Sequence, residues 1–187
     1  SERQTLCGGR AVYEACVKLR QDLDSRPWQP GEERRAEYYY ACDPCFAIGD
    51  FEGAKKRGAK YRNFPAYAYA TQAAIVEVDR ETGEVRLLKV IAAHDVGRAI
   101  NPHIIEGQMH GSCSMGQGYA LSEGYPTENG YPVKTLYRQL GLPRAEDTPD
   151  YEIILIEDPE PQGPFGAKGI SEVATVPVTP AILNAVS

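Results

Sequence analysis

The chain has 187 residues, of which 42% are hydrophobic and 25% charged, so it can bury a core and is not disordered as a whole. Its 20 basic and 26 acidic residues give a net charge of −6, which disfavours a protein that binds nucleic acid through the phosphates. No run approaches the ~18 apolar residues of a membrane span, and no signal-peptide pattern opens the chain. We therefore expect neither a nucleic-acid nor a membrane partner. We also expect a cytoplasmic location, because the five cysteines are best explained as free thiols.

The first third of the chain predicts one helix, one strand and a long loop. Apolar residues recur at three- and four-residue spacing over 9–25, which predicts a helix that ends at the breaker cluster 26–31. Three consecutive tyrosines favour a strand over 33–41, because aromatic residues favour the extended state. Residues 43–65 have the composition of a loop.

A β-hairpin is predicted next. Residues 67–79 and 84–93 have strand composition, and Gly83 in the turn 80–83 can take a positive φ. Ala74, Val76 and Val78 form an apolar face of the first strand, which we expect to be buried. A loop follows over 94–102.

The second half predicts a glycine-rich helix, a strand and a terminal helix. The helix over 102–123 contains four glycines, each costing about 0.5–1 kcal/mol against alanine, which indicates close approach of a ligand or of another backbone; plain close packing is the alternative. Residues 150–156 form a strand, 161–172 a glycine loop, and Thr179 and Pro180 open the last helix as N-cap and first residue. This irregular mixture predicts an α+β fold, with two layers and a mixed, largely antiparallel sheet.

Cysteine and histidine pairs give only weak candidates for metal or catalytic sites. Cys42 and Cys45 have zinc-like spacing, but no second pair stands at a usual spacing, so ordinary thiols are favoured. His103 and His110 are seven residues apart and could share a helix face, although two ligands make half a site. His94 is a third candidate ligand or base.

The glycine loop that ends at Glu172 is the segment with the clearest signal for a functional site. Gly163, Gly166 and Gly169 allow backbone amides to approach a ligand closely. Glu172 stands before an apolar stretch, where a carboxylate can serve as a general base. The alternative is a turn in which the glutamate caps the next helix.

Five short motifs in four stretches carry a resemblance to a known family. They are SERQT at 1–5 with GRAV at 9–12, DVGRAINP at 95–102, GQMHG at 107–111 and GAKGISE at 166–172. In this order they resemble the carboxy-terminal part of the molybdenum-binding subunit of the xanthine dehydrogenase and aldehyde oxidase family. The sequence departs from that family at Ser171, where glycine is usual, and at His110, where many members carry an acidic residue.

The resemblance implies a molybdenum hydroxylase that inserts water-derived oxygen at a carbon of an N-heterocycle, such as a purine or xanthine. Its cofactor is molybdopterin, the molybdenum cofactor. Glu172 matches the general base that takes the proton from the hydroxide on molybdenum, and Gln108 matches the glutamine that hydrogen-bonds the pterin. Ser1 and Gln4 lie in a segment that contacts the cofactor.

The same resemblance implies partners. The chain has neither the cysteines for two [2Fe–2S] clusters nor a flavin-type dinucleotide loop, and it lacks the first half of the molybdenum subunit. We expect residues 1–187 to be the carboxy-terminal portion of a molybdopterin-binding domain and a fragment of a longer subunit. Its partners would be the rest of that subunit and iron–sulfur and flavin (FAD) domains or subunits, and it would be inactive alone.

Several alternatives stay open. An aldehyde oxidoreductase, a carbon monoxide dehydrogenase or a hydroxybenzoyl-CoA reductase would share these motifs. A non-catalytic assembly domain that keeps the fold is a different class of function. A zinc module built on Cys42 and Cys45 is a third possibility.

Overall fold

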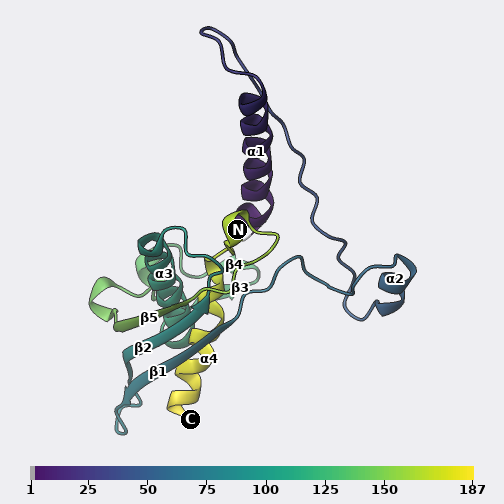
Figure 1. The fold of residues 1–187 in the computed structure, drawn as a ribbon. Helices are drawn as coiled ribbons and strands as arrows, with labels where there is room; N and C mark the ends of the chain where they lie inside the picture. Colours follow the sequence, from purple (N-terminus) through teal and green to yellow (C-terminus); the bar gives the residue numbers. More distant parts are fainter. Residues whose placement is uncertain (1–2) are drawn as a thin grey trace.

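A three-stranded sheet with two helices on one face forms the body of the protein (Figure 1). The structure is a computed structural model and describes residues 3–187; Ser1, a predicted cofactor contact, lies outside them. Strand β1 (Ala70–Val78) pairs antiparallel with β2 (Val85–Asp95), and β2 pairs parallel with β5 (Asp150–Ile156). The sheet is therefore mixed, and the predicted α+β class is confirmed.

The core lies between this sheet and the helices α3 (Pro102–Leu121) and α4 (Thr175–Val186). Ala74 and Val76 of β1 pack against it, as the apolar face predicted, whereas Val78 is 40% exposed at the end of the strand. Strand β2 and helices α3 and α4 contribute fully buried apolar side chains to this core: Val90, Ala92, Met109, Cys113, Val178 and Ile182.

The remaining elements are short or project from this body. A π-helical turn (Gln4–Gly8) leads into α1 (Gly9–Ser25), and a long extended segment carries the small helix α2 (Phe51–Lys56). Figure 1 shows α1 and this segment reaching away from the sheet. The rest are a small hairpin and 3₁₀ turns: β3 (Thr127–Glu128), β4 (Tyr131–Pro132), Tyr137–Gln139, Ala145–Asp147, Pro164–Gly166 and Glu172–Ala174. None of the helices described is both long and apolar enough to span a membrane.

The strand predicted over 33–41 is wrong. This segment is extended but pairs with no strand among residues 3–187. Side chains hold it instead: the buried guanidinium of Arg34 donates to the carboxylate of Asp22 at 3.1 Å and to the carbonyl oxygen of Arg26 at 2.6 Å. The tyrosines favour an extended backbone, but an extended segment becomes a β-strand only when it pairs with a partner strand.

Two further expectations need correction. The loop predicted over 43–65 contains α2, whose first turn is capped by Asp50, because its carboxylate accepts the N–H of Gly53 at 2.9 Å. Helix α4 begins at Thr175, so Pro180 lies inside it and Thr179 is not its cap. The Thr179 hydroxyl instead donates to the carbonyl oxygen of Gly116 at 2.8 Å, a contact between helices that no local pattern contains.

Candidate functional site

The loop between β5 and α4, residues 157–174, brings the resembling stretches together. It contains the fourth stretch, 166–172, and ends in the 3₁₀ turn Glu172–Ala174. Gly9 of the first stretch, Gly97 and Arg98 of the second, and Ser112, the residue after the third, lie against this loop. Segments that are distant in sequence are thus close in space.

The loop after β2 pairs with it through the backbone. Gly97 and Ala167 form an antiparallel bridge, the N–H of Arg98 donates to Gly166 O at 2.9 Å, and the N–H of Lys168 donates to Val96 O at 3.1 Å. Gly97 has φ +62°, and a Cβ there would lie 2.4 Å from Gly166 O. A side chain at this position would therefore clash, which explains why the sequence has glycine here.

The amino-terminal stretch packs on the same loop from another side. A Cβ on Gly9 would lie 2.8 Å from Cγ of Pro164, and the rings of Tyr13 and Phe165 meet edge to face with centroids 4.9 Å apart. Gln4 lies in the π-helical turn with its side chain over Gly8, and it is exposed. Gln4 therefore lies just before α1, the helix that contacts the loop, and the Gln4 side chain is exposed and accessible to a ligand.

Helix α3 is fastened directly to the turn that carries Glu172. The Ser112 hydroxyl donates to the carbonyl oxygen of Ser171, and the Thr175 hydroxyl donates to the carbonyl oxygen of Ser112 at 3.2 Å. Gln108 precedes Ser112 by four residues, one helical turn, so the two lie on one side of the helix. The fastening therefore holds the start of the Glu172 turn at α3, one helical turn after Gln108.

The predicted base and the predicted pterin ligand on α3 are both exposed, as a site for a ligand requires. Neither the Glu172 carboxylate nor the Gln108 amide is buried among the residues described. The Ser171 hydroxyl lies 3.4 Å from Oε2 of Glu172 and donates toward it. The departure from the family pattern at Ser171 thus places a hydrogen-bond donor next to the predicted base.

The other chemical candidates lie elsewhere. His103 is exposed with its Nδ1 3.8 Å from Glu106, and the ring of His110 stacks on Tyr151 with centroids 4.9 Å apart. Cys42 and Cys45 are exposed. Within residues 3–187 no group of three or more metal-ligating side chains could hold an ion, so the zinc module finds no support.

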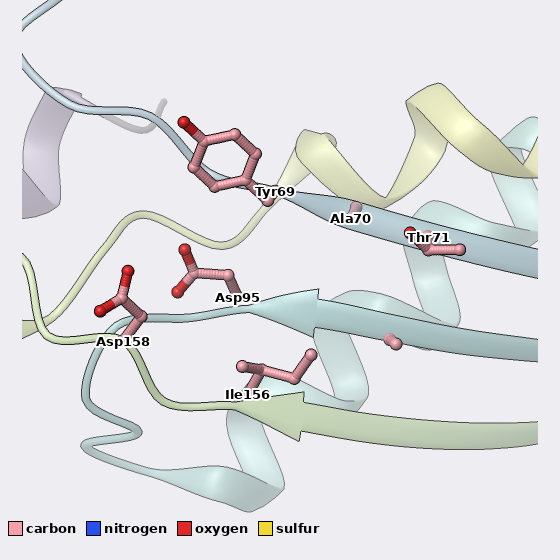
Figure 2. Close-up of a pocket in the computed structure, with 7 residues that line it drawn as sticks. Tyr69, Ala70, Thr71, Asp95, Ile156 and Asp158 are labelled. Atoms are coloured by element: carbon pink, nitrogen blue, oxygen red, sulfur yellow. The ribbon is translucent and has the colours of Figure 1, made fainter.

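A cavity of about 260 Å³ lies at the carboxyl ends of β2 and β5 (Figure 2). Its wall includes Tyr69, Thr71, Asp95, Ile156 and Asp158. None of Gln4, Gln108 and Glu172 lines it. Gln4, Gln108 and Glu172 are therefore exposed residues that lie outside this cavity.

Comparison with known proteins identifies the class. A family model described as "Molybdopterin cofactor-binding domain" matches residues 1–149. The chain is 35% identical over 126 residues to the carbon monoxide dehydrogenase large chain of Hydrogenophaga pseudoflava, covering 64% of this chain and 15% of that protein. It is 31% identical over 188 residues to the aldehyde oxidoreductase molybdenum-binding subunit PaoC of Escherichia coli O157:H7, covering 94% and 26%.

A solved structure agrees. The crystal structure of quinoline 2-oxidoreductase from Pseudomonas putida 86 matches with a TM-score of 0.61 and 36% identity, over 64% of this chain and 15% of that one. Residues 1–149 thus match a molybdopterin cofactor-binding domain, and this match covers more than half of the chain. The chain belongs to the xanthine dehydrogenase and aldehyde oxidase family, so the predicted family and the predicted cofactor, molybdopterin, are confirmed. It spans 15% and 26% of the length of the two relatives named above.

The residues on the surface of α3 fit this cofactor. Gly107 and Gly111 are exposed, and a Cβ at either would meet no atom within 4 Å, so the helix backbone is bare beside Gln108. A primary amide both donates and accepts hydrogen bonds, which suits the edge of a pterin. Open backbone next to an exposed amide allows a flat polar group to approach closely.

Sequence reasoning missed residues that hold this site in place. Ser112 lies one turn after Gln108, so its position on the same side of the helix was available as a signal. Gln72 is a polar residue between Ala70 and Ala74 on the inward face of β1, which also signals a specific contact. Asp95 and Lys168 belong to two of the resembling stretches and pair with each other.

Proposed function

We propose that this chain is part of a molybdenum hydroxylase that hydroxylates a carbon of an N-heterocycle, purine- or xanthine-like, with oxygen from water. Glu172 is the general base. The observation that carries the proposal is the fastening of the Glu172 turn to Ser112 of α3, one turn from Gln108. This contact supports a carboxylate and an amide acting on one bound group.

Each residue has a defined task in this proposal. The amide of Gln108 holds the pterin by hydrogen bonds, and Gln4 adds a contact from the amino-terminal turn; Ser1 precedes it in the sequence. The carboxylate of Glu172 accepts the proton that is released as oxygen passes to the substrate, which contributes typically ~10²–10⁴-fold in rate. The bound cofactor supplies the redox chemistry, that is, it takes up the electron pair from the substrate carbon.

The size of the relatives supports a role as one portion of a larger subunit. We propose that residues 1–187 form the carboxy-terminal portion of a molybdopterin-binding domain. The remaining part of that subunit, together with iron–sulfur and flavin partners, completes the path of electrons away from the cofactor. A cytoplasmic location stays part of the proposal.

The test is Glu172→Gln in the assembled enzyme, because glutamine keeps the shape and removes the basic oxygen. We expect kcat to fall at least 100-fold, by analogy with other general bases, while molybdenum and pterin content stay at the wild-type level. Glu81→Gln, in the exposed turn between β1 and β2, is the matched control and should leave kcat unchanged. Unchanged turnover of Glu172→Gln would favour the alternative, a non-catalytic assembly domain.

The substrate class is tested separately. The quinoline enzyme named above supports an N-heterocycle, whereas the two relatives support an aldehyde or carbon monoxide. Turnover of the assembled enzyme with hypoxanthine, quinoline, an aromatic aldehyde and carbon monoxide separates these classes. Turnover confined to the aldehyde or to carbon monoxide would replace the heterocycle with that alternative.

A further inference from the structure

A buried polar cluster lies beneath the Glu172 turn, on the sheet side. Nε2 of Gln72 in β1 lies 2.9 Å from the carbonyl oxygen of Ala174, 2.8 Å from Nε2 of His94 and 3.7 Å from Sγ of Cys113. Ala174 is the last residue of the turn Glu172–Ala174. His94, Cys113 and Ala174 are all fully buried.

The chemistry of the acceptors fixes the orientation of the Gln72 amide. A carbonyl oxygen can only accept, so the Gln72 atom that faces Ala174 is the NH₂ group. Its second hydrogen points to His94, which must then accept through Nε2 and carry its proton on Nδ1. Burial also lowers the pKa of His94, in agreement with a neutral ring.

This arrangement has a cost that other side chains would avoid. Among residues 3–187, Oε1 of Gln72 and Nδ1 of His94 are buried without a hydrogen-bond partner. Buried polar atoms without partners are rare because they lose their hydrogen bonds to water. An apolar pair at positions 72 and 94 would fill the core without this cost, and would leave the Ala174 carbonyl without its donor.

We infer that Gln72, oriented by His94, is a positioning residue that holds the Glu172 turn from the sheet side, opposite the fastening by Ser112. This inference rests on the proposed role of Glu172 as the base. The turn is then held at the carbonyl of Ser171, which directly precedes Glu172, and at the carbonyl of Ala174, two residues after it. With its backbone held on both sides, the exposed carboxylate keeps its direction toward the bound substrate, as a base must.

The test uses a double-mutant cycle in the assembled enzyme. Gln72→Met keeps the length of the side chain and removes the donor, and we expect kcat to fall about 3- to 10-fold, the effect of one hydrogen bond, with KM and molybdenum content unchanged. In the Glu172→Gln background the same change should have no further effect on kcat, since the residue acts only through Glu172. Val90→Ala, which loses buried methyl groups from the same sheet, is the control for destabilisation and should leave kcat unchanged.

The histidine gives an independent comparison should Gln72→Met yield no folded enzyme. His94→Gln supplies an acceptor oxygen to the Gln72 amide and should retain most of kcat, whereas His94→Phe removes the acceptor and should lower it about as much as Gln72→Met. Equal kcat values for the two His94 variants would overturn the inference. The inference would also be overturned if Gln72→Met lowered kcat as much in the Glu172→Gln background as in the wild type. An unchanged kcat in Glu172→Gln alone would instead overturn the proposed function.

Discussion

The ammonium group of Lys168 contacts the carboxylate of Asp95, and only 7% and 6% of the two side chains are exposed. Lys168 belongs to the glycine loop, and Asp95 is the last residue of β2. The other oxygen of Asp95 accepts the N–H of Gly97 at 3.0 Å. One buried pair therefore holds together two of the stretches that carry the family resemblance, next to the loop that ends at Glu172.

Removing one partner of this pair should destabilise the fold strongly. Lys168→Met leaves the Asp95 carboxylate buried and unpaired, so we expect the free energy of unfolding to fall by about 3–5 kcal/mol. Adding Asp95→Asn should recover part of the loss, because no buried charge remains. Urea unfolding measures both. Lys89→Met is the control, since its partner Glu152 is 51% exposed and such pairs contribute about 1 kcal/mol or less; an equal loss in both lysine variants would contradict the expectation.

The glycines of α3 should separate packing from cofactor binding. A Cβ on Gly116 would lie 1.8 Å from Cγ1 of Val178, so Gly116→Ala should destabilise the protein by about 1–3 kcal/mol. A Cβ on Gly111 meets nothing, so Gly111→Ala should stabilise the helix by about 0.5–1 kcal/mol. Gly111→Ala should nevertheless lower the pterin content of the assembled enzyme, because the methyl group covers backbone beside Gln108. Full pterin content in Gly111→Ala would show that the cofactor does not approach this position.

Local patterns in the sequence were sufficient for the elements with strong periodicity or clear ends. Helix α3, predicted over 102–123, ends at Leu121; Asn101 is its cap, and the Asn101 side chain accepts the N–H of Ile104 at 3.2 Å. The strand over 150–156 has the predicted bounds. The glycines of α3 lie in different surroundings. Gly116 allows α3 and α4 to pack closely, whereas Gly107 and Gly111 leave the backbone open to solvent.

The long-range contacts could not be predicted from the sequence. Gln72 and Ala174 are 102 residues apart, and only the fold places one beneath the other. The early start of α4 has the same origin, since Thr175 and Thr179 bond to the backbone of α3. The tyrosines at 38–40 show the converse, because their strand preference was not realised without a partner strand.

Stability should depend on pH through His94. Burial lowers the pKa of His94 below its ordinary value of about 6.5. The unfolded chain therefore binds this proton more readily than the folded one, and stability is lost as the pH falls below about 6.5, with a slope of at most ~1.4 kcal/mol per pH unit. Urea unfolding from pH 7.5 to 5.5 measures the slope. His94→Gln should reduce it, and His103→Gln, at an exposed position, should not; equal slopes in the wild type and His94→Gln would show that other groups cause the dependence.

Cysteine labelling should report the intact core. Burial raises the pKa of the Cys113 thiol to about 11, so at pH 8 only about one molecule in a thousand carries the reactive thiolate, and the sulfur is also covered. Cys16, Cys42 and Cys45 are exposed. With iodoacetamide at pH 8 we expect these three to be modified in the folded protein and Cys113 only after unfolding in urea, as measured by peptide mass spectrometry.

Cys113 lies in the cluster around Gln72. Gln72→Met, which leaves Cys113 covered by the methionine side chain, should therefore keep it protected, and rapid labelling in that variant would mean that the core beneath the Glu172 turn has opened.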